Sequence, residues 1–286
     1  MVEDFGRKVA YFRKAKGISI KKLAEDLCDE STIYRLEKGK QLPRLEIVSE
    51  ICQKLEIPFK ALFPFNEEIE DLKKKCREFT YVADYLSLEL IIEESERVLN
   101  ELNSTYSKLE FKKFIMWHRA ILLHKKEHRV DDALTTLNSL VSLKNYSSEL
   151  DISIVNSIGL IYLAKGNYKE ALHIYKDLYA IVKNRVIIED YTLLPRIGYN
   201  YSNSLFKMGM YKEGLLIGKE VLFYLKTNNL MYSLGETYHL IGVLSKKNGD
   251  LKDAEEAFNQ ALLVFMFTGN NLNVSRTKKD LNNLSK

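Results

Sequence analysis

The chain has 286 residues and a formal net charge of +4 at pH 7. Hydrophobic residues make up 46% and charged residues 29% of it, a globular composition that excludes a largely disordered chain. Only 4 Pro and 13 Gly are present, which disfavours a turn-rich all-β fold and favours long helices. The apolar runs are short for a membrane span, Met1–Asp4 carries no secretory-type apolar stretch, and the three cysteines form no CxxC pair. We therefore expect a cytoplasmic, helical protein with reduced thiols.

Residues 1–65 carry most of the basic excess, with 13 Lys or Arg against 10 Asp or Glu. Apolar spacing and capping signals predict five short helices in this segment. The first ends at Lys16-Gly17, the second is capped by Ser19 and runs to about Leu27, and the third starts at Asp29. Pro43 opens the fourth, and a fifth runs from Ile57-Pro58 to about Phe63. Two short helices joined by a tight turn predict a helix-turn-helix.

Two stretches carry a family resemblance, Gly17 to Leu27 (GISIKKLAEDL) and Ser31 to Gly39 (STIYRLEKG). Together with Pro43 and the closing Leu62-Phe63, they resemble the Cro/CI-type (XRE) DNA-binding domain over about residues 5–63. The resemblance implies that the second helix of the motif enters the major groove of DNA. It also implies an internal ion pair between Arg13 and Glu37.

The resemblance assigns the candidate DNA-binding residues. Those expected at base edges are Glu30, Ser31, Thr32 and Tyr34. Those expected near the flanking phosphates are Arg35, Lys38, Lys40 and Arg44. Base contacts read sequence, whereas phosphate contacts fix position and make binding salt-dependent.

Residues 110–268 repeat at intervals of about 38 to 43 residues. Ile158-Gly159 followed by Gly166-Asn-Tyr168 and Ala171 corresponds to Ile241-Gly242 followed by Gly249-Asp-Leu251 and Ala254. This is the tetratricopeptide pattern, in which small residues let paired helices cross closely and aromatic side chains fill the gaps. A weaker unit spans about Cys76 to Glu101, and a capping helix is expected over about Val274 to Leu284. The predicted fold is all-α, with the five-helix head followed by a right-handed superhelix of about five degenerate repeats and the capping helix.

No catalytic pattern stands out in the sequence. The histidines, at 118, 124, 128, 173 and 239, show no metal-ligand spacing with Cys or acidic residues. No GxSxG, HExxH or phosphate-binding glycine loop is present. We therefore expect no enzymatic activity, no cofactor and no metal.

Stacked helix pairs form a concave surface that suits an extended peptide. Helical phase predicts that the first helix of each pair presents groove residues. These candidates are His118, Leu122, Lys125, Asn156, Leu160, Leu163, Arg196, Tyr199, Asn200, Asn203, Glu236, His239, Val243 and Lys246. Asparagine both donates and accepts, so a pair of asparagines can hold a peptide backbone. Lys125, Arg196 and Lys246 suit a ligand with acidic groups or a free carboxylate.

The chain as a whole resembles the peptide-responsive quorum-sensing regulators of Gram-positive bacteria, in the PlcR-like branch. The features that carry the resemblance are the head, the chain length, the repeats and the stretches Val155–Tyr162 and Gly198–Leu205. That resemblance implies a transcriptional regulator controlled by a short signalling peptide. It implies that Asn156 and Asn200 hold the peptide backbone, and that a homodimer binds a roughly palindromic DNA operator. The expected domains are a DNA-binding head over 1–65, a connecting helix over 66–86 that overlaps the first repeat, and a repeat domain for peptide binding and dimerisation over 75–286.

Two other functions remain open from the sequence. The repeats suit a protein-interaction adaptor, in which the head serves as a tether or dimerisation unit. The mixture of Asn, His, Lys and Tyr in the groove also suits a regulator that responds to a small molecule. Replacement of Asn156 separates the adaptor from a peptide receptor, because a broad protein interface depends little on one amide.

Overall fold

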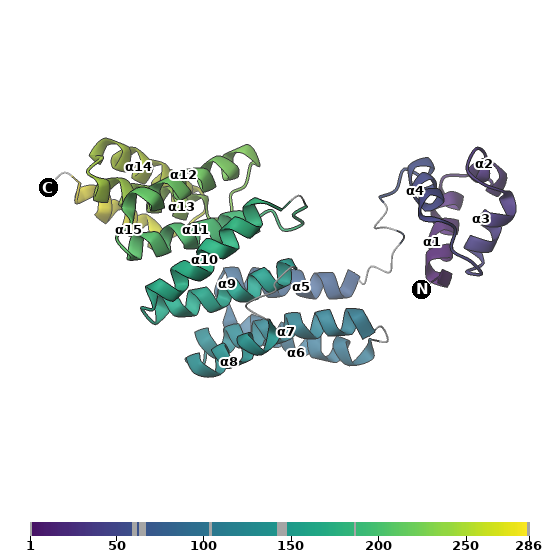
Figure 1. The fold of residues 1–286 in the computed structure, drawn as a ribbon, viewed down its shortest axis with the longest axis horizontal. Helices are drawn as coiled ribbons and strands as arrows, with labels where there is room; N and C mark the ends of the chain where they lie inside the picture. The colour runs from purple at the N-terminus through teal and green to yellow at the C-terminus, as the bar shows by residue number, and fades with distance from the viewer. Residues whose placement is uncertain are drawn as a thin grey trace. The chain divides into compact units, whose positions relative to one another are not determined.

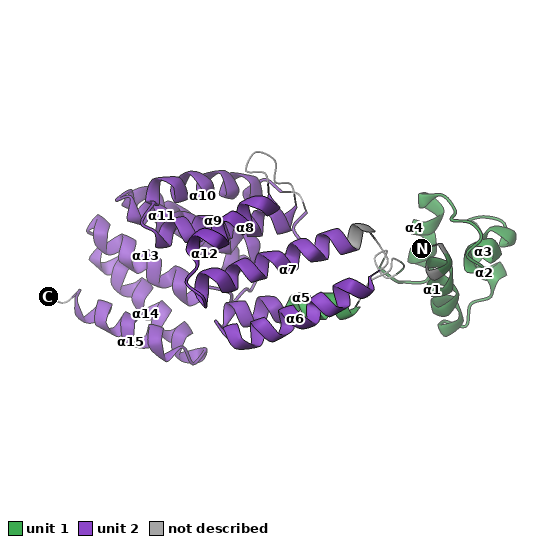
Figure 2. Ribbon diagram, turned by 90° about the horizontal axis from the view of Figure 1, so that it is seen from below, with its two compact units in different colours: residues 1–74 green, residues 75–286 purple. Residues whose placement is uncertain are grey.

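A computed structural model describes residues 2–58, 62, 67–102, 105–141, 148–185 and 187–284. Over these residues the regular structure is helical and contains no β-strand, which confirms the predicted all-α class (Figure 1). The chain divides into two compact units, residues 1–74 and residues 75–286 (Figure 2). Across the described part of the chain, no helix is both long and apolar enough to cross a membrane.

The head contains four described helices. They are α1 (Val2–Ala15), α2 (Ile20–Ala24), α3 (Glu30–Glu37) and α4 (Leu45–Lys54). Ser19 caps α2 as predicted, because its side chain accepts a hydrogen bond from the Lys22 backbone N–H. Helix α2 ends at Ala24, three residues before the predicted end, because Asp26 adopts a left-handed backbone with φ of 61°. The turn between α2 and α3 is correspondingly longer than the sequence predicts.

One apolar core holds the head together, and α3 contributes Ile33 and Leu36 to it. Close approach of the helices depends on glycine: a Cβ at Gly6 of α1 would lie 2.0 Å from the backbone oxygen of Leu36. The fifth helix predicted from Ile57 to Phe63 falls mostly outside the described residues. Leu62 is described, and its side chain is fully buried in the same core.

Helix α5 (Glu67–Tyr81) follows the head, and α6 (Tyr85–Glu101) follows α5. The expected connecting helix over 66–86 is therefore interrupted at residues 82–84. Ala83 has a φ of 59°, and the Asp84 carboxylate accepts from the backbone N–H and the hydroxyl of Ser87 at 3.1 and 2.6 Å. Asp84 is thus the N-cap of α6, and the left-handed residue Ala83 separates α6 from α5.

The remaining helices pack as successive antiparallel pairs and form a superhelical stack (Figure 1). They are α7 (Thr105–Lys125), α8 (Val130–Leu140), α9 (Glu149–Ala164), α10 (Tyr168–Lys183), α11 (Leu193–Lys207), α12 (Tyr211–Thr227), α13 (Leu234–Asn248) and α14 (Leu251–Phe267). Helix α15 (Asn271–Asn282) packs on α14 at the end of the stack, at the predicted position of the capping helix.

In the pairs α9–α10 and α13–α14, the first helix carries a glycine where the second helix brings an aromatic ring. A Cβ at Gly159 would lie 2.7 Å from Cζ of Tyr175, and a Cβ at Gly242 would lie 2.7 Å from Cδ1 of Phe258. These contacts confirm the packing predicted from the repeat pattern. The pairs α9–α10 and α13–α14 turn over three and two residues respectively, whereas the connection from α10 to α11 takes residues 184–192. The long repeat interval is therefore accommodated between the helix pairs.

Candidate functional site

The exposed side of α3 is the candidate DNA-binding surface. Ile33 and Leu36 fix one side of the helix in the core, and the predicted contact residues occupy the other. Thr32 is half-buried, and the exposed ones are Glu30, Ser31, Tyr34, Arg35, Lys38, Lys40 and Arg44. The Lys38 ammonium lies 5.9 Å from the centre of the Tyr34 ring. This surface presents four cations around one helix, which suits a polyanion.

A buried ion pair positions α3 relative to α1. The Arg13 guanidinium donates two hydrogen bonds to the Glu37 carboxylate, at 2.6 and 2.8 Å. Its third contact is the Ile18 backbone oxygen at 2.7 Å, just before α2. The side chains are about one-tenth exposed, so this bidentate pair connects three segments of the head inside the protein.

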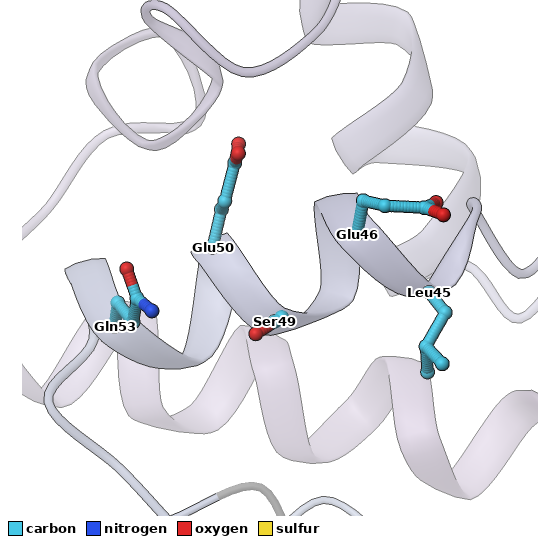
Figure 3. A pocket seen from close by; sticks show the side chains of 5 residues that line it. All are labelled: Leu45, Glu46, Ser49, Glu50 and Gln53. Atoms are coloured by element: carbon cyan, nitrogen blue, oxygen red, sulfur yellow. The ribbon is translucent and has the colours of Figure 1, made fainter.

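An open hollow along α4 is lined by Leu45, Glu46, Ser49, Glu50 and Gln53, all from the same helix (Figure 3). Two of these side chains are carboxylates, so the hollow is unsuited to a phosphate backbone. The basic residues on and just after α3, rather than this hollow, are the candidates for nucleic-acid contact.

Two asparagines face each other between consecutive repeats. Asn200 on α11 donates from Nδ2 to Oδ1 of Asn156 on α9, at 2.8 Å, and both side chains are buried. The backbone oxygen of Asn156 accepts from the Tyr175 hydroxyl at 3.0 Å, and that of Asn200 accepts from Ser204 at 2.7 Å. The Tyr175 hydroxyl therefore links α10 to α9 beside the pair. Over the described residues, Nδ2 of Asn156 and Oδ1 of Asn200 make no hydrogen bond, which leaves one donor and one acceptor.

Arg196 is committed to an internal network. Its Nη2 lies 2.9 Å from Oδ2 of Asp190 and 3.4 Å from the Ser153 hydroxyl. Burial would raise the pKa of Asp190, but Arg196 and Thr192 hold that pKa below its usual value, so the carboxylate stays charged. The sequence assigned Arg196 to an acidic ligand, whereas the structure shows its charge balanced by Asp190.

His118 and His239 differ from the exposed groove positions that helical phase predicts. His118 is fully buried between the rings of Phe114 and Trp117, at centroid distances of 4.2 and 4.4 Å. Burial lowers its pKa to about 3, so its imidazole is neutral. His239 lies 2.9 Å from the Asp280 carboxylate of α15. Helical phase alone does not distinguish a groove position from a contact with the next helix.

The other predicted groove residues vary in exposure. Lys125 and Leu160 are exposed, whereas Tyr199, Asn203, Val243 and Lys246 are half-buried. Lys246 donates to the backbone oxygen of Asn283, at 3.0 Å, so it binds the C-terminal end of α15.

Sequence reasoning missed the part that the end of α5 plays in the repeat unit. The Arg77 guanidinium lies 5.5 Å from the ring centre of Phe114, and the Tyr81 ring lies 5.3 Å from that of Tyr232. Tyr81 and Tyr232 are about 150 residues apart in sequence, so no local pattern signals their contact. An α5 side chain thereby reaches the segment that precedes α13.

A helix-turn-helix head and a stack of helix pairs with an inter-repeat amide pair define a class of DNA-binding repeat protein. Residues 9–62 match a helix-turn-helix family, and residues 78–280 match the RNPP family C-terminal domain. The second match covers more than half of the chain. The chain therefore belongs to the RNPP family.

Solved structures share the fold. Bacillus thuringiensis PlcR in complex with the peptide PapR7 and DNA has a TM-score of 0.81 at 19% identity, over 98% of this chain and 99% of PlcR. ComR from S. thermophilus, in complex with DNA and its signalling peptide ComS, has a TM-score of 0.67 at 14% identity, over 99% and 100%. The SHP pheromone receptor Rgg2 of Streptococcus dysgalactiae has a TM-score of 0.66 at 16% identity, over 98% of this chain and 99% of Rgg2. Comparison with curated proteins finds no match.

Proposed function

We propose that this protein is a cytoplasmic transcriptional regulator of quorum sensing, and not an enzyme. Its head binds a roughly palindromic DNA operator, and a short signalling peptide bound in the repeat groove controls that binding. The proposal is supported by the presence, in one RNPP-family chain, of an exposed basic recognition helix and a buried amide pair open to a peptide backbone.

The amide pair is the observation that carries peptide binding. Asn156 and Asn200 hold each other in place, and the free donor and acceptor that remain match the C=O and N–H of a peptide unit. Because the pair is preorganised, little side-chain entropy is lost when a peptide binds. Leu160, Lys125, Tyr199, Asn203 and Val243 offer side-chain contacts along the same set of helices, while His118, His239, Arg196 and Lys246 hold those helices in position.

The solved structures support the assignment of DNA binding to the head and peptide binding to the repeat unit. PlcR was solved with the peptide PapR7 and DNA, and ComR with DNA and the signalling peptide ComS. In this chain, DNA recognition falls to Glu30, Ser31, Thr32 and Tyr34 at base edges. Phosphate contacts fall to Arg35, Lys38, Lys40 and Arg44.

A homodimer is part of the proposal. Exposed apolar side chains gather on the second helices of the last two repeats and at the start of the capping helix: Leu216 and Phe223 on α12, Leu263, Met266 and Phe267 on α14, and Leu272 on α15. Leu216 and Phe223 are seven residues apart and share one side of α12. Apolar surface of this kind suits an interface between two copies, and a two-fold dimer matches a palindromic operator.

The test is a thermal-shift and calorimetric titration of the full-length protein with short peptides cut from the secreted precursors of its own host. A peptide that binds only the folded protein raises its unfolding temperature. We expect a saturable shift that Asn156→Ala abolishes. Asn259→Ala, an exposed position on α14, is the matched control and should leave the shift unchanged.

Other outcomes separate the alternatives. A shift with a small metabolite but no peptide would support the small-molecule regulator. Capture of a folded protein that is unaffected by Asn156→Ala would support the adaptor. Either result contradicts the proposed peptide control.

A further inference from the structure

The carboxylate of Glu236 occupies an unusual position in the repeat unit. Glu236 lies in the first turn of α13, on a half-buried site. Within the described residues it forms no salt bridge and no hydrogen bond. A half-buried carboxylate without a cation is costly to desolvate, and it gains most from a ligand that brings positive charge.

Three tyrosines lie close enough to this carboxylate to feel its charge. Tyr232 lies one turn before it in the chain, and the Tyr81 ring packs on Tyr232 at a centroid distance of 5.3 Å and a tilt of 34°. Tyr199 lies on α11, which contacts α13. Burial raises the pKa of all three phenols, and the negative charge of Glu236 raises each further. The four side chains therefore lie within electrostatic reach of one another.

The nearby cations do not neutralise Glu236. Arg196 is close enough to lower the pKa of Tyr232, but its charge is paired with Asp190 at 2.9 Å. Arg276 on α15 is exposed and close enough to lower the pKa of Tyr199, yet it makes no salt bridge to Glu236 in the described residues. Tyr81 is 60% exposed, so one side of the tyrosine group is open to solvent.

Two hydroxyls at the start of α13, on the N-cap residue Ser233 and on Thr237, also lack partners. Ser233 Oγ and Thr237 Oγ1 are buried and make no hydrogen bond in the described structure, and Thr237 is only 1% exposed. Ser233 has a φ of 50°, a left-handed backbone that a serine rarely adopts. Ser233 lies three residues before Glu236, and an unsatisfied hydroxyl oxygen can accept a hydrogen bond from an N–H group of a cation.

We propose that Glu236, Tyr81, Tyr199 and Tyr232 form a subsite for a cationic group of the bound peptide. The cation is either the N-terminal ammonium or a Lys or Arg side chain, since both bring N–H donors and a positive charge to the face of aromatic rings. The inference rests on the proposed peptide-binding function and adds a charge requirement to it. It also reverses the sequence-based expectation of an acidic ligand at this part of the groove.

The test is affinity selection by the full-length protein from a random heptapeptide library, prepared once with free and once with acetylated N-termini. Bound peptides are identified by mass spectrometry. We expect wild-type protein to enrich cationic peptides about tenfold over Glu236→Gln. Loss of binding on acetylation identifies the ammonium, whereas retained binding with Lys or Arg at one position identifies a side chain. Glu255→Gln, at an exposed glutamate of α14, is the control and should select as the wild type does.

Glu236→Lys distinguishes loss of the subsite from misfolding, because it should shift the selection towards Asp- or Glu-containing peptides. If wild type and Glu236→Gln enrich the same peptides without a preference for cations, the inference is wrong and the proposed function stands. If no peptide is enriched by any variant, the proposed function fails and the inference fails with it.

Discussion

The head and the repeat unit place their functional side chains in opposite environments. The DNA-binding candidates on and around α3 are exposed apart from the half-buried Thr32, and the Lys38 ammonium lies over the Tyr34 ring. Apart from the exposed Lys125 and Leu160, the peptide-binding candidates are buried or half-buried. Asn156, Arg196 and His239 are each bonded to another helix or to the segment before one. The head therefore offers mobile charges to a uniform polyanion, whereas the repeat unit offers a few fixed hydrogen-bonding groups to one particular ligand.

This difference also divides stability from recognition. In the head, the buried Arg13–Glu37 ion pair and the core residues Ile33 and Leu36 fix the recognition helix, and the exposed recognition residues contribute little to folding. In the repeat unit, the same contacts that position the groove also hold the helices together. Mutations should therefore separate binding from stability in the head and combine them in the repeat unit.

The largest effect is expected from Arg13→Ala. The variant leaves the Glu37 carboxylate buried without its partner, which costs about 3–5 kcal/mol. Urea unfolding of the full chain followed by circular dichroism should show an earlier transition for the head. Fluorescence of Trp117, the single tryptophan and a repeat-unit residue, should keep its midpoint.

Arg7→Ala is the control for this prediction, because the pair of Arg7 with Glu3 is exposed and worth less than about 1 kcal/mol. An unchanged circular dichroism transition for Arg13→Ala would show that the buried pair does not support the head. A Trp117 midpoint that moves with the head would show that the two units unfold together.

A pH effect of intermediate size is expected from His118. Its pKa is about 3 in the folded protein, because burial opposes its charge, against 6.5 as the ordinary value. His118 is therefore protonated below about pH 6.5 in the unfolded chain, but only below about pH 3 in the folded chain. Stability is lost as the pH falls through this window, by about 2 kcal/mol at pH 5.

His118→Phe removes this titration, so its unfolding free energy should fall less than that of the wild type between pH 7 and pH 5. Trp117 fluorescence in urea measures both proteins. His173→Gln, at an exposed position on α10, should retain the wild-type dependence. Identical pH dependence in wild type and His118→Phe would mean that His118 is hydrated rather than buried.

The smallest effect is expected from Lys38→Ala. Its ammonium is exposed and contributes one phosphate contact per head, so the slope of log affinity against log salt should fall by about one for each head bound. Fluorescence anisotropy with a generic DNA duplex measures the slope. Lys252→Ala on α14 is the matched exposed control, and equal slopes for the two variants would place the DNA-binding surface elsewhere.

Much of the fold follows from local sequence signals. The Ser19 cap, the glycine-aromatic contacts of the repeats and the exposed side of α3 arise from residues close in sequence or from a repeating pattern. The early end of α2 does not, because it depends on one residue, Asp26, in a left-handed conformation that its sequence does not demand.

The candidate peptide site is less predictable, because its chemistry is decided by pairs about 40 residues apart. Helical phase selects Asn200 and Arg196 alike, yet Asn200 bonds to Asn156 across 44 positions and Arg196 bonds to Asp190 only 6 positions away. His239 is likewise bonded to Asp280, 41 positions away. The stacking of the repeats therefore determines which polar groups remain available to a ligand, and the local sequence does not reveal them.

The central claim is that the repeat groove controls the head, and reciprocal linkage tests it most directly. DNA affinity is measured with and without a saturating host-derived peptide, and peptide affinity with and without saturating DNA. The account predicts that both affinities change by the same factor, since coupling between two binding sites is reciprocal, and that Asn156→Ala removes the coupling. A peptide that binds tightly through Asn156 and leaves DNA affinity unchanged would contradict it.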